Sequence, residues 1–205
     1  MLLAGDIGGT KTVLALFSTA DSSDTLNPLH METYPSGRFS SLEMIVEKFL
    51  HDKNVNIEAA SFGVAGPVVS GRSQITNLPW IIDSTTIRQL LQIKQVTLLN
   101  DLESIATAVP HLQSNDLAII NEGEADPEGA IAVIAPGTGL GEAFLIWDGQ
   151  RYQAQPSEGG HASFAPTNAE QRELQAFLEQ KFNHVSFERV CSGSGIPNLY
   201  NFWQH

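Results

Sequence analysis

Two glycine-rich segments have the composition of phosphate-binding turns. Asp6 ends an apolar run and precedes Gly8-Gly9-Thr10-Lys11, and Gly137-Thr138-Gly139 lies between two other apolar runs. Paired glycines expose successive backbone amides that can hold phosphate, while a carboxylate such as Asp6 can hold Mg²⁺ through water. An ordinary hairpin turn is the alternative for either segment. If both bind phosphate, we expect them to hold one triphosphate from two sides.

Neither segment fits the better-known nucleotide motifs. A Walker P-loop needs the spacing Gly-x4-Gly-Lys-Ser/Thr and a helix after it, and neither segment has both. A dinucleotide fingerprint also precedes a helix, whereas the residues after Gly139 form an apolar run typical of a strand.

Polar residues that suit a polyhydroxyl ligand recur along the chain. Asn100-Asp101 follows the apolar run 95–99, where open α/β sheets place ligands. Glu158 and His161 flank two glycines that allow close backbone approach, and Glu188 begins a further polar segment. A carboxylate can accept two hydroxyl donors, and histidine can donate or accept.

Each of these residues also has a structural interpretation. Asp101 could only cap a helix, and Glu188 could be a solvated charge or pair with Arg189. Glu158 and His161 could ligate zinc, but the cysteine cluster that usually completes such a site is missing. Asn77, just before Leu78-Pro79-Trp80, could contact ligand or stand above a packed tryptophan.

The apolar pattern predicts an α/β arrangement that would position these residues. We expect a hairpin over 2–6 and 13–17, then a polar loop over 21–28. Helical spacing predicts a helix capped by Ser40 or Ser41, one capped by Asp83, and one after Asp101 with Ile105 and Ala108 facing inward. Strands are predicted at 30–34, at the sheet edge, and at 59–65 and 95–99, which implies a partly parallel sheet.

The second half of the chain repeats the opening unit in shortened form. A hairpin is predicted over 131–135 and 142–147, followed by a strand at 151–155 and a helix over 170–182. The chain stops inside an apolar helical stretch, 196–203, with Leu199, Phe202 and Trp203 uncovered. We therefore expect a truncated second lobe.

Composition narrows the class of protein. The 205 residues carry a net charge of −12, which opposes binding to nucleic acid or acidic membranes. No apolar run reaches the ~18 residues of a membrane span. The single cysteine, Cys191, excludes an internal disulfide framework and a multi-cysteine zinc site. We expect a cytoplasmic protein with no zinc and no redox cofactor.

Taken in order, the motifs resemble the bacterial glucokinase family, within the superfamily of sugar kinases, heat-shock ATPases and actin. The resemblance runs over essentially the whole chain. The resemblance rests on six segments: Gly5–Thr10, Asn77–Trp80, Asn100-Asp101, Gly137–Gly141, Glu158–His161 and Ser186–Gly193.

The resemblance implies an actin-like ATPase (ribonuclease H-like) α/β fold with two lobes, 1–110 and 111–205, that hinge near Val109-Pro110. It implies phosphorylation of glucose to glucose 6-phosphate by ATP with Mg²⁺, the first step of glycolysis. Asp101 would be the catalytic base. The implied sugar contacts are Asn77, Asn100, Asp101, Glu158, His161 and Glu188, and the implied phosphate contacts are Asp6, Gly8, Gly9, Thr10, Lys11, Gly137, Thr138 and Gly139.

Two other functions remain open at this point. A kinase of the repressor-and-kinase type, acting on another hexose or an amino sugar, shares the Glu-x-Gly-His turn but adds a cysteine-rich zinc loop that this sequence lacks. A non-catalytic sugar-binding regulator is the second alternative. The apolar terminus favours self-association, and a homodimer is expected.

Overall fold

The computed structural model describes residues 1–19, 27–75, 77–124 and 126–205. They form two compact units, Met1–Ser104 and Ile105–His205. The expected loop at 21–28 lies for the most part outside the described residues. The predicted lobe boundary at residue 110, and the hinge there, stay predictions.

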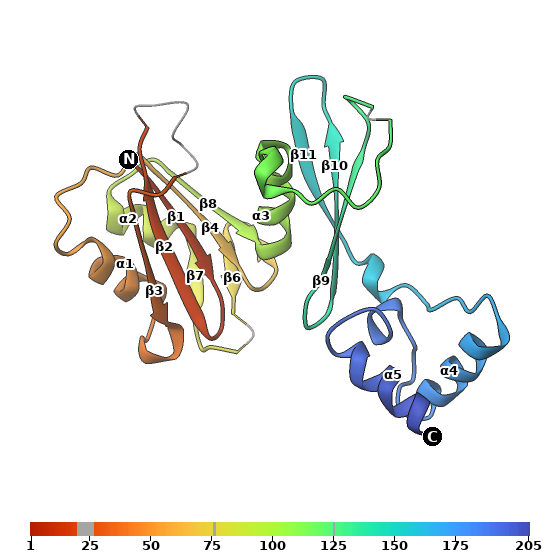
Figure 1. The fold of residues 1–205 in the computed structure, drawn as a ribbon. Coiled ribbons are helices and arrows are strands. Elements are labelled where there is room, and N and C mark those ends of the chain that lie inside the picture. Colours follow the sequence, from red (N-terminus) through yellow and green to blue (C-terminus); the bar gives the residue numbers. More distant parts are fainter. Residues whose placement is uncertain (20–26, 76, 125) are drawn as a thin grey trace. The chain divides into compact units, whose positions relative to one another are not determined.

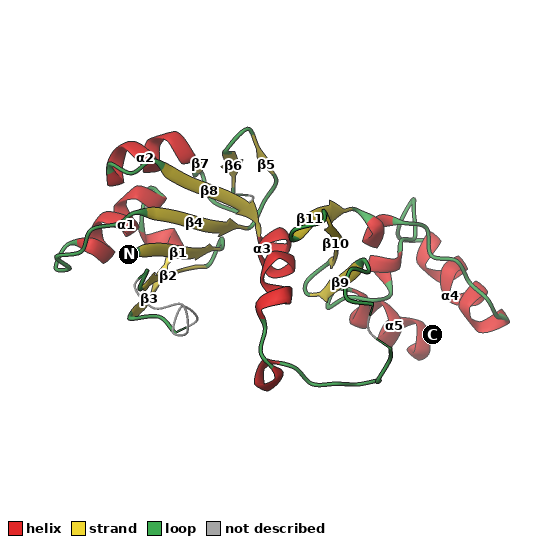
Figure 2. Cartoon of the chain, turned by 90° about the horizontal axis from the view of Figure 1, so that it is seen from above, coloured by secondary structure: helices red, strands yellow, loops and turns green. Residues whose placement is uncertain are grey.

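A five-stranded sheet organises the first unit, in the order β3-β2-β1-β4-β8, which can be followed in Figure 2. β1 runs antiparallel to β2 but parallel to β4, and β4 runs parallel to β8. The expected hairpin, edge strand and partly parallel sheet are therefore confirmed. The strands are β1 (Leu2–Ile7), β2 (Lys11–Phe17), β3 (His30–Pro35), β4 (Ala59–Val64) and β8 (Gln95–Asn100).

Two helices pack against this sheet and complete its core (Figure 1). α1 (Leu42–Leu50) buries Leu42, Ile45, Val46 and Phe49, which recur at the spacing of one helical face. In α2 (Ser84–Leu91) the Asp83 carboxylate accepts a hydrogen bond from the Thr85 amide, so the expected cap is confirmed. Ser41 occupies the N-cap position of α1, as expected, but its side chain makes no capping bond, and the Ser40 hydroxyl donates to Met44 Sδ.

The helix after β8 differs from its prediction. α3 (Asp101–Ala108) forms where expected, but Ile105 is 53% exposed and Ala108 is exposed, whereas Ala106 is buried. In a helix of about two turns, apolar spacing does not define one buried face.

A small antiparallel sheet lies between β4 and α2 in the sequence. It is formed by β5 (Val68–Val69), β6 (Arg72–Gln74) and β7 (Ile81–Asp83).

The second unit contains an antiparallel sheet in the order β11-β10-β9 and two helices. The expected second hairpin, third strand and helices are confirmed. Their bounds are β9 (Ile131–Pro136), β10 (Leu140–Trp147), β11 (Tyr152–Ser157), α4 (Ala169–Glu179) and α5 (Gly195–Gln204). Short 3-10 helices in the chain are η1 (Ser36–Arg38), η2 (Val109–His111), η3 (Ser114–Asp116), η4 (Gly159–His161) and η5 (Phe187–Arg189).

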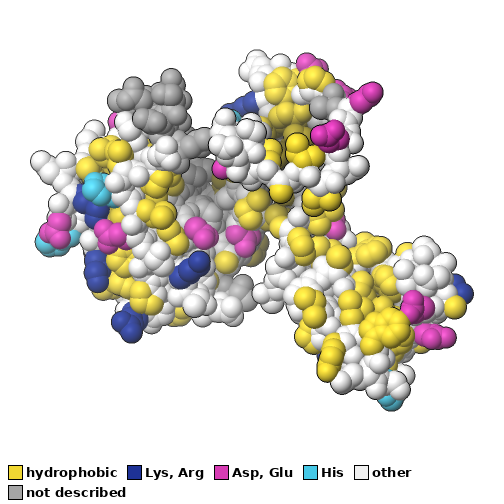
Figure 3. All heavy atoms as spheres, viewed as in Figure 1, with side chains coloured by type: hydrophobic (Ala, Val, Ile, Leu, Met, Phe, Trp, Pro, Cys, Tyr) yellow, Lys and Arg dark blue, Asp and Glu magenta, His cyan; other side chains and the backbone are white. Residues whose placement is uncertain are grey.

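α5 is partly covered, which corrects the expected exposure of its apolar face. Leu199 and Phe202 pack against a core that includes Leu174 and Leu178 of α4. Trp203 is 68% exposed and continues a stripe with two further exposed residues, Ile196 and Tyr200. Hydrophobic side chains gather on the surface of this helical part in Figure 3. No helix in the described part of the chain is long and apolar enough to cross a membrane.

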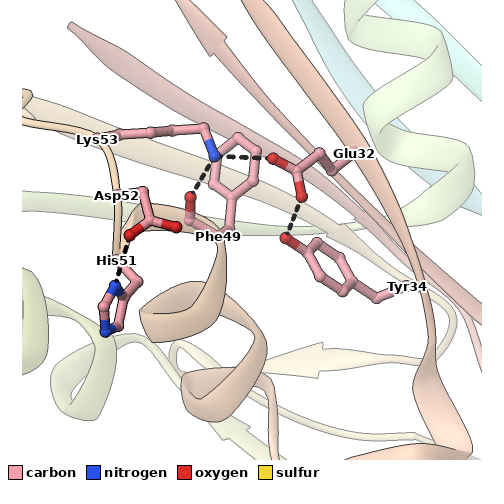
Figure 4. Close-up of polar contacts among 6 residues, drawn as sticks. All are labelled: Glu32, Tyr34, Phe49, His51, Asp52 and Lys53. Carbon is pink, nitrogen blue, oxygen red and sulfur yellow. Dashed lines mark hydrogen bonds and ion pairs between the residues drawn. The ribbon is translucent and has the colours of Figure 1, made fainter.

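An ion pair joins the edge strand β3 to the segment after α1 (Figure 4). Lys53 Nζ donates to Glu32 Oε1 at 2.7 Å and to the Phe49 carbonyl, and the Tyr34 hydroxyl donates to Glu32 Oε2 at 2.6 Å. The hydrogen bonds from Lys53 and Tyr34 lower the pKa of Glu32 below its ordinary 4.5. Burial, together with the bond to Glu32, raises the pKa of Tyr34.

We predict that Glu32→Gln destabilises the protein at pH 7 by about 0.3 to 1 kcal/mol, a small effect because Glu32 is half-exposed and solvent screens the pair. A lowered folded-state pKa stabilises the native state above pH 4.5, and this stabilisation is lost as pH falls through the folded-state value. The difference from wild type should therefore shrink between pH 5 and pH 3 in urea unfolding. Glu47→Gln, on the exposed side of α1, is the control. Equal stability of Glu32→Gln and wild type at pH 7 would contradict the prediction.

Candidate functional site

The first glycine hairpin is closed by its own backbone and braced from outside. The Gly8 amide donates to the Lys11 carbonyl at 2.9 Å, so this amide closes the turn. The Ser36 hydroxyl donates to the Gly8 carbonyl at 2.8 Å, and the Ser36 amide donates to the Thr10 carbonyl. The hydroxyls of Thr12 and Ser36 lie 3.0 Å apart, and both residues are fully buried. The braced turn leaves Thr10 and Lys11 exposed.

Asn77 lies beside this turn. A Cβ added at Gly9 would come within 3.1 Å of Asn77 Cβ, so the structure brings the predicted sugar contact and phosphate turn together within the first unit. Trp80 packs in the core, 2% exposed, and its indole N–H donates to the Phe39 carbonyl at 3.2 Å. Trp80 is therefore a packing residue, whereas Asn77 lies beside the Gly8–Lys11 turn.

Asp6 and Asn100-Asp101 reach the same edge of the sheet. In the parallel register Ile7 pairs with Val64 and Val64 pairs with Asn100, so β1, β4 and β8 end side by side. Asp6 alternates with the buried Leu3 and Ile7 and is exposed. The carboxyl ends of parallel strands form the usual ligand edge of an open α/β sheet.

The Asn100 side chain is held on both sides. Its Nδ2 donates to the Gly66 carbonyl at 3.1 Å, and its Oδ1 accepts from the Leu102 amide at 3.0 Å. Asn100 is therefore the residue that caps α3, whereas Asp101, the first residue of the helix, accepts from the same amide through Oδ1 at 2.9 Å. Asp101 is exposed, and a carboxylate that contacts the backbone through one oxygen keeps the other for a ligand.

The second hairpin is braced by the segment that leads into α5. The Gly137 amide donates to the Gly139 carbonyl at 2.9 Å, which closes this turn from within. The Gly193 amide donates to the Gly137 carbonyl at 2.8 Å, and the Ser194 amide donates to the Thr138 carbonyl at 3.1 Å. A Cβ at Gly193 would lie 2.8 Å from that Gly137 oxygen, so only glycine fits without a shift.

Glu188 contacts the second hairpin. Its Oε2 accepts from the Leu140 amide at 3.0 Å, at the first residue of β10. The space beside Gly139 is filled by this carboxylate, which a Cβ there would overlap. Arg189 instead stacks over the Phe182 ring, with Cζ 4.3 Å from the ring centre. Neither structural alternative, a free charge or a pair with Arg189, describes Glu188.

The Glu158–His161 turn packs against the same strand. Gly160 is buried, and a Cβ there would overlap the Leu140 carbonyl; a Cβ at Gly159 would overlap the Glu142 carboxylate. His161 Nε2 lies 3.6 Å from Glu158 Oε2, and both side chains are largely exposed. In the described part of the chain, no three His, Cys, Asp or Glu side chains are grouped as metal ligands.

The structure thus gathers the predicted residues into two groups. One group, in the first unit, holds Asp6, the Gly8–Lys11 turn, Asn77 and Asn100-Asp101. The other, in the second unit, holds the Gly137–Gly139 turn, Glu158–His161 and Glu188. Sequence reasoning missed Ser36, Thr12 and Glu142, since serine, threonine and glutamate in isolation carry no signal of a contact that is distant in sequence.

Comparison with known proteins places the fold among the sugar kinases. A solved glucokinase from an Antarctic psychrotroph superposes with a TM-score of 0.88 at 35% identity, covering 98% of this chain and 63% of that one. A glucokinase from Balamuthia mandrillaris, solved in complex with glucose, superposes with a TM-score of 0.71 at 24% identity, covering 98% of this chain and 62% of that one. The expected fold class is confirmed.

The particular family follows from the sequence matches. The family model described as Glucokinase matches residues 3–205. A glucokinase from Nostoc punctiforme is 44% identical over 205 residues, which is 98% of this chain and 60% of that protein. The chain belongs to the glucokinase family, and it spans about 60% of the length of the curated relatives it matches.

We predict that Ser36→Ala loosens the first phosphate turn. It removes the donor to the Gly8 carbonyl and the partner of the buried Thr12 hydroxyl, at a cost of about 1 to 3 kcal/mol in unfolding free energy. The affinity for inorganic tripolyphosphate should fall as well, because the turn loses its brace. Urea unfolding and calorimetry measure the two effects.

Ser40→Ala is the matched control, because Ser40 is exposed and contacts only a methionine sulfur by hydrogen bond among the described residues. It should change stability by less than about 0.5 kcal/mol. If both variants behave alike, the Ser36 brace is unimportant.

Proposed function

We propose that this chain provides the glucose-binding and phosphate-binding part of a glucokinase, which transfers the γ-phosphoryl group of ATP to the 6-hydroxyl of glucose. The observation that carries the proposal is the convergence on β10: the Glu158–His161 turn and Glu188 both pack against Leu140 or its neighbours, directly after the Gly137–Gly139 turn. This arrangement supports a polyol site and a phosphate turn on one strand.

In this proposal the two hairpins hold the ATP phosphates. Gly8–Lys11 and Gly137–Gly139 would supply backbone amides, and Lys11 would add a positive charge. Mg²⁺ commonly binds through one or two carboxylates and keeps several waters. The exposed Asp6 carboxylate, next to the first turn, fits that role and would place the ion to neutralise phosphate charge.

Glu158, His161 and Glu188, with Asn77 and Asn100, would hold the sugar hydroxyls. Their carboxylates, amides and imidazole can each donate or accept hydrogen bonds in the directions that a polyol demands. Once the site closes over the sugar, a partner left unpaired in it would cost about 1 to 3 kcal/mol, which disfavours an epimer with one hydroxyl reversed.

Asp101 would act as the general base. The 6-oxygen of glucose attacks the γ-phosphorus, the bond to the bridging β–γ oxygen breaks, and ADP leaves with that electron pair. The hydroxyl proton passes to the Asp101 carboxylate and then to solvent. Because phosphoryl transfer has a loose transition state, late proton transfer to an ordinary carboxylate suffices, and placement matters more than basicity.

The setting of the enzyme is also part of the proposal. A single cysteine and a charge of −12 suit the reducing cytoplasm, where glucose phosphorylation opens glycolysis. A homodimer is supported by the exposed stripe of Ile196, Tyr200 and Trp203 on α5.

The direct test is calorimetric titration of the protein with glucose, with galactose as the control sugar. We expect glucose to bind and galactose to bind at least tenfold more weakly, since one reversed hydroxyl leaves a partner unpaired. Equal binding of both sugars, or no binding by folded protein, would remove the sugar site as assigned.

We predict that Asp101→Ala separates binding from transfer. In a version extended to the full length of its relatives, glucose affinity should stay within about tenfold of wild type, while glucose-dependent release of ADP from ATP should fall by at least about 10². Asp116→Ala is the control, an exposed carboxylate in η3 that caps its own short helix. Near-normal ADP release by Asp101→Ala would exclude Asp101 as the base.

A further inference from the structure

Leu140 is contacted by both predicted sugar-binding segments. Its amide donates to Glu188 Oε2 at 3.0 Å, and its carbonyl occupies the place where a Gly160 side chain would stand. Leu140 is also the first residue after the Gly137–Gly139 turn. The backbone between the phosphate turn and strand β10 is therefore held by groups that belong to the sugar site.

The Glu188 contact is held in place from several sides. The Ser192 hydroxyl donates to the Glu188 carbonyl at 2.7 Å, which fixes the backbone of this residue. The absence of a side chain at Gly139 leaves the space that the carboxylate fills. Within the described residues Oε2 has the Leu140 amide as its partner, and Oε1 has no hydrogen-bond partner.

We propose that Glu188 is a positioning residue that couples the sugar site to the phosphate turn: a sugar hydroxyl on Oε1 fixes the carboxylate, and Oε2 then fixes the Leu140 amide and the Gly137–Gly139 turn before it. This inference rests on the proposed function, because it takes glucose as the ligand of Oε1. It adds that glucose organises the phosphate site through one named hydrogen bond.

The coupling has a simple physical origin. Glu188 Oε2 already accepts from the Leu140 amide, and a sugar hydroxyl on Oε1 would remove the rotamer freedom that the side chain still has. Once it is fixed, the Leu140 amide and the turn are ordered without a second entropic cost. Coupling between two binding sites is reciprocal, so phosphate in the turn must tighten glucose binding by the same factor. We expect a factor of about five or more.

Gly139→Ala tests the contact without changing Glu188 itself. The added methyl group takes the place of Glu188 Oε2, and the flexible end of that side chain can move away. Gly139 lacks the positive φ found at Gly71 and Gly149, so alanine fits its backbone. Gly123→Ala, in the same unit but in neither predicted site, is the matched control, because no described residue lies within 4 Å of its added Cβ.

The first readout is the backbone amide spectrum of the ¹⁵N-labelled protein during titration with glucose. In wild type and Gly123→Ala, glucose should shift the amides of Gly160 and His161 and also those of Gly139 and Leu140. In Gly139→Ala the shifts at 160–161 should persist while the Leu140 shift is lost. Glu188→Ala, which leaves the sequence of the turn unchanged, should lose the Leu140 shift as well.

The second readout is glucose affinity with and without inorganic tripolyphosphate and Mg²⁺, measured by calorimetry. Tripolyphosphate should tighten glucose binding about fivefold or more in wild type and less than twofold in Gly139→Ala. A merely structural role for Glu188 would change stability but not this ratio.

The outcomes separate the two proposals. Glucose shifts confined to 160–161 in wild type, or an equal fivefold effect in Gly139→Ala, would overturn the coupling and leave the proposed function intact. A folded wild-type protein whose amides do not respond to glucose would contradict both.

Discussion

Close approach of backbone at glycine is the constraint on which the second unit depends. At Gly139, Gly159, Gly160 and Gly193 the space for a side chain is taken by another part of the chain: the Glu188 carboxylate, the Glu142 carboxylate, the Leu140 carbonyl and the Gly137 carbonyl. Three segments distant in sequence therefore meet at the start of β10. A larger residue at Gly160 or Gly193 would meet backbone, which cannot move aside as a side chain can, and would separate those segments.

The two glycine hairpins are stabilised by different groups from outside the turn. In each, the first glycine amide closes the turn, through Gly8 to Lys11 and Gly137 to Gly139. The first turn is then braced by the buried Ser36 hydroxyl, and the second by two backbone amides from 193–194. Turns that are braced from outside can present amides to phosphate without reorganising, so no reorganisation energy is needed when charge develops in a transition state. This chain thus contains two antiparallel glycine hairpins, each with its own support.

Much of this arrangement could be predicted from the sequence, because its signals are local. Apolar runs bracketed by glycine predicted both hairpins, and the structure has both. Predictions failed where the deciding contact was not local. Ala106, not Ile105, is buried in α3. Ser41 occupies the N-cap position of α1 as predicted, but residue preference predicts only the position, and the side-chain bond is not made. The bond from Leu140 to Glu188 spans 48 positions, and no pattern at either end indicates it. The roles of the site residues in catalysis remain predictions.

The central claim is that glucose binds where the Glu158–His161 turn and Glu188 meet the start of β10. A crystal structure of this protein grown with glucose tests it most directly. The account predicts electron density for the sugar within hydrogen-bonding distance of Glu158, His161 and Glu188, with the bond from the Leu140 amide to Glu188 retained. Glucose bound elsewhere on the protein, or bound only after Glu188 has left the Leu140 amide, would contradict it.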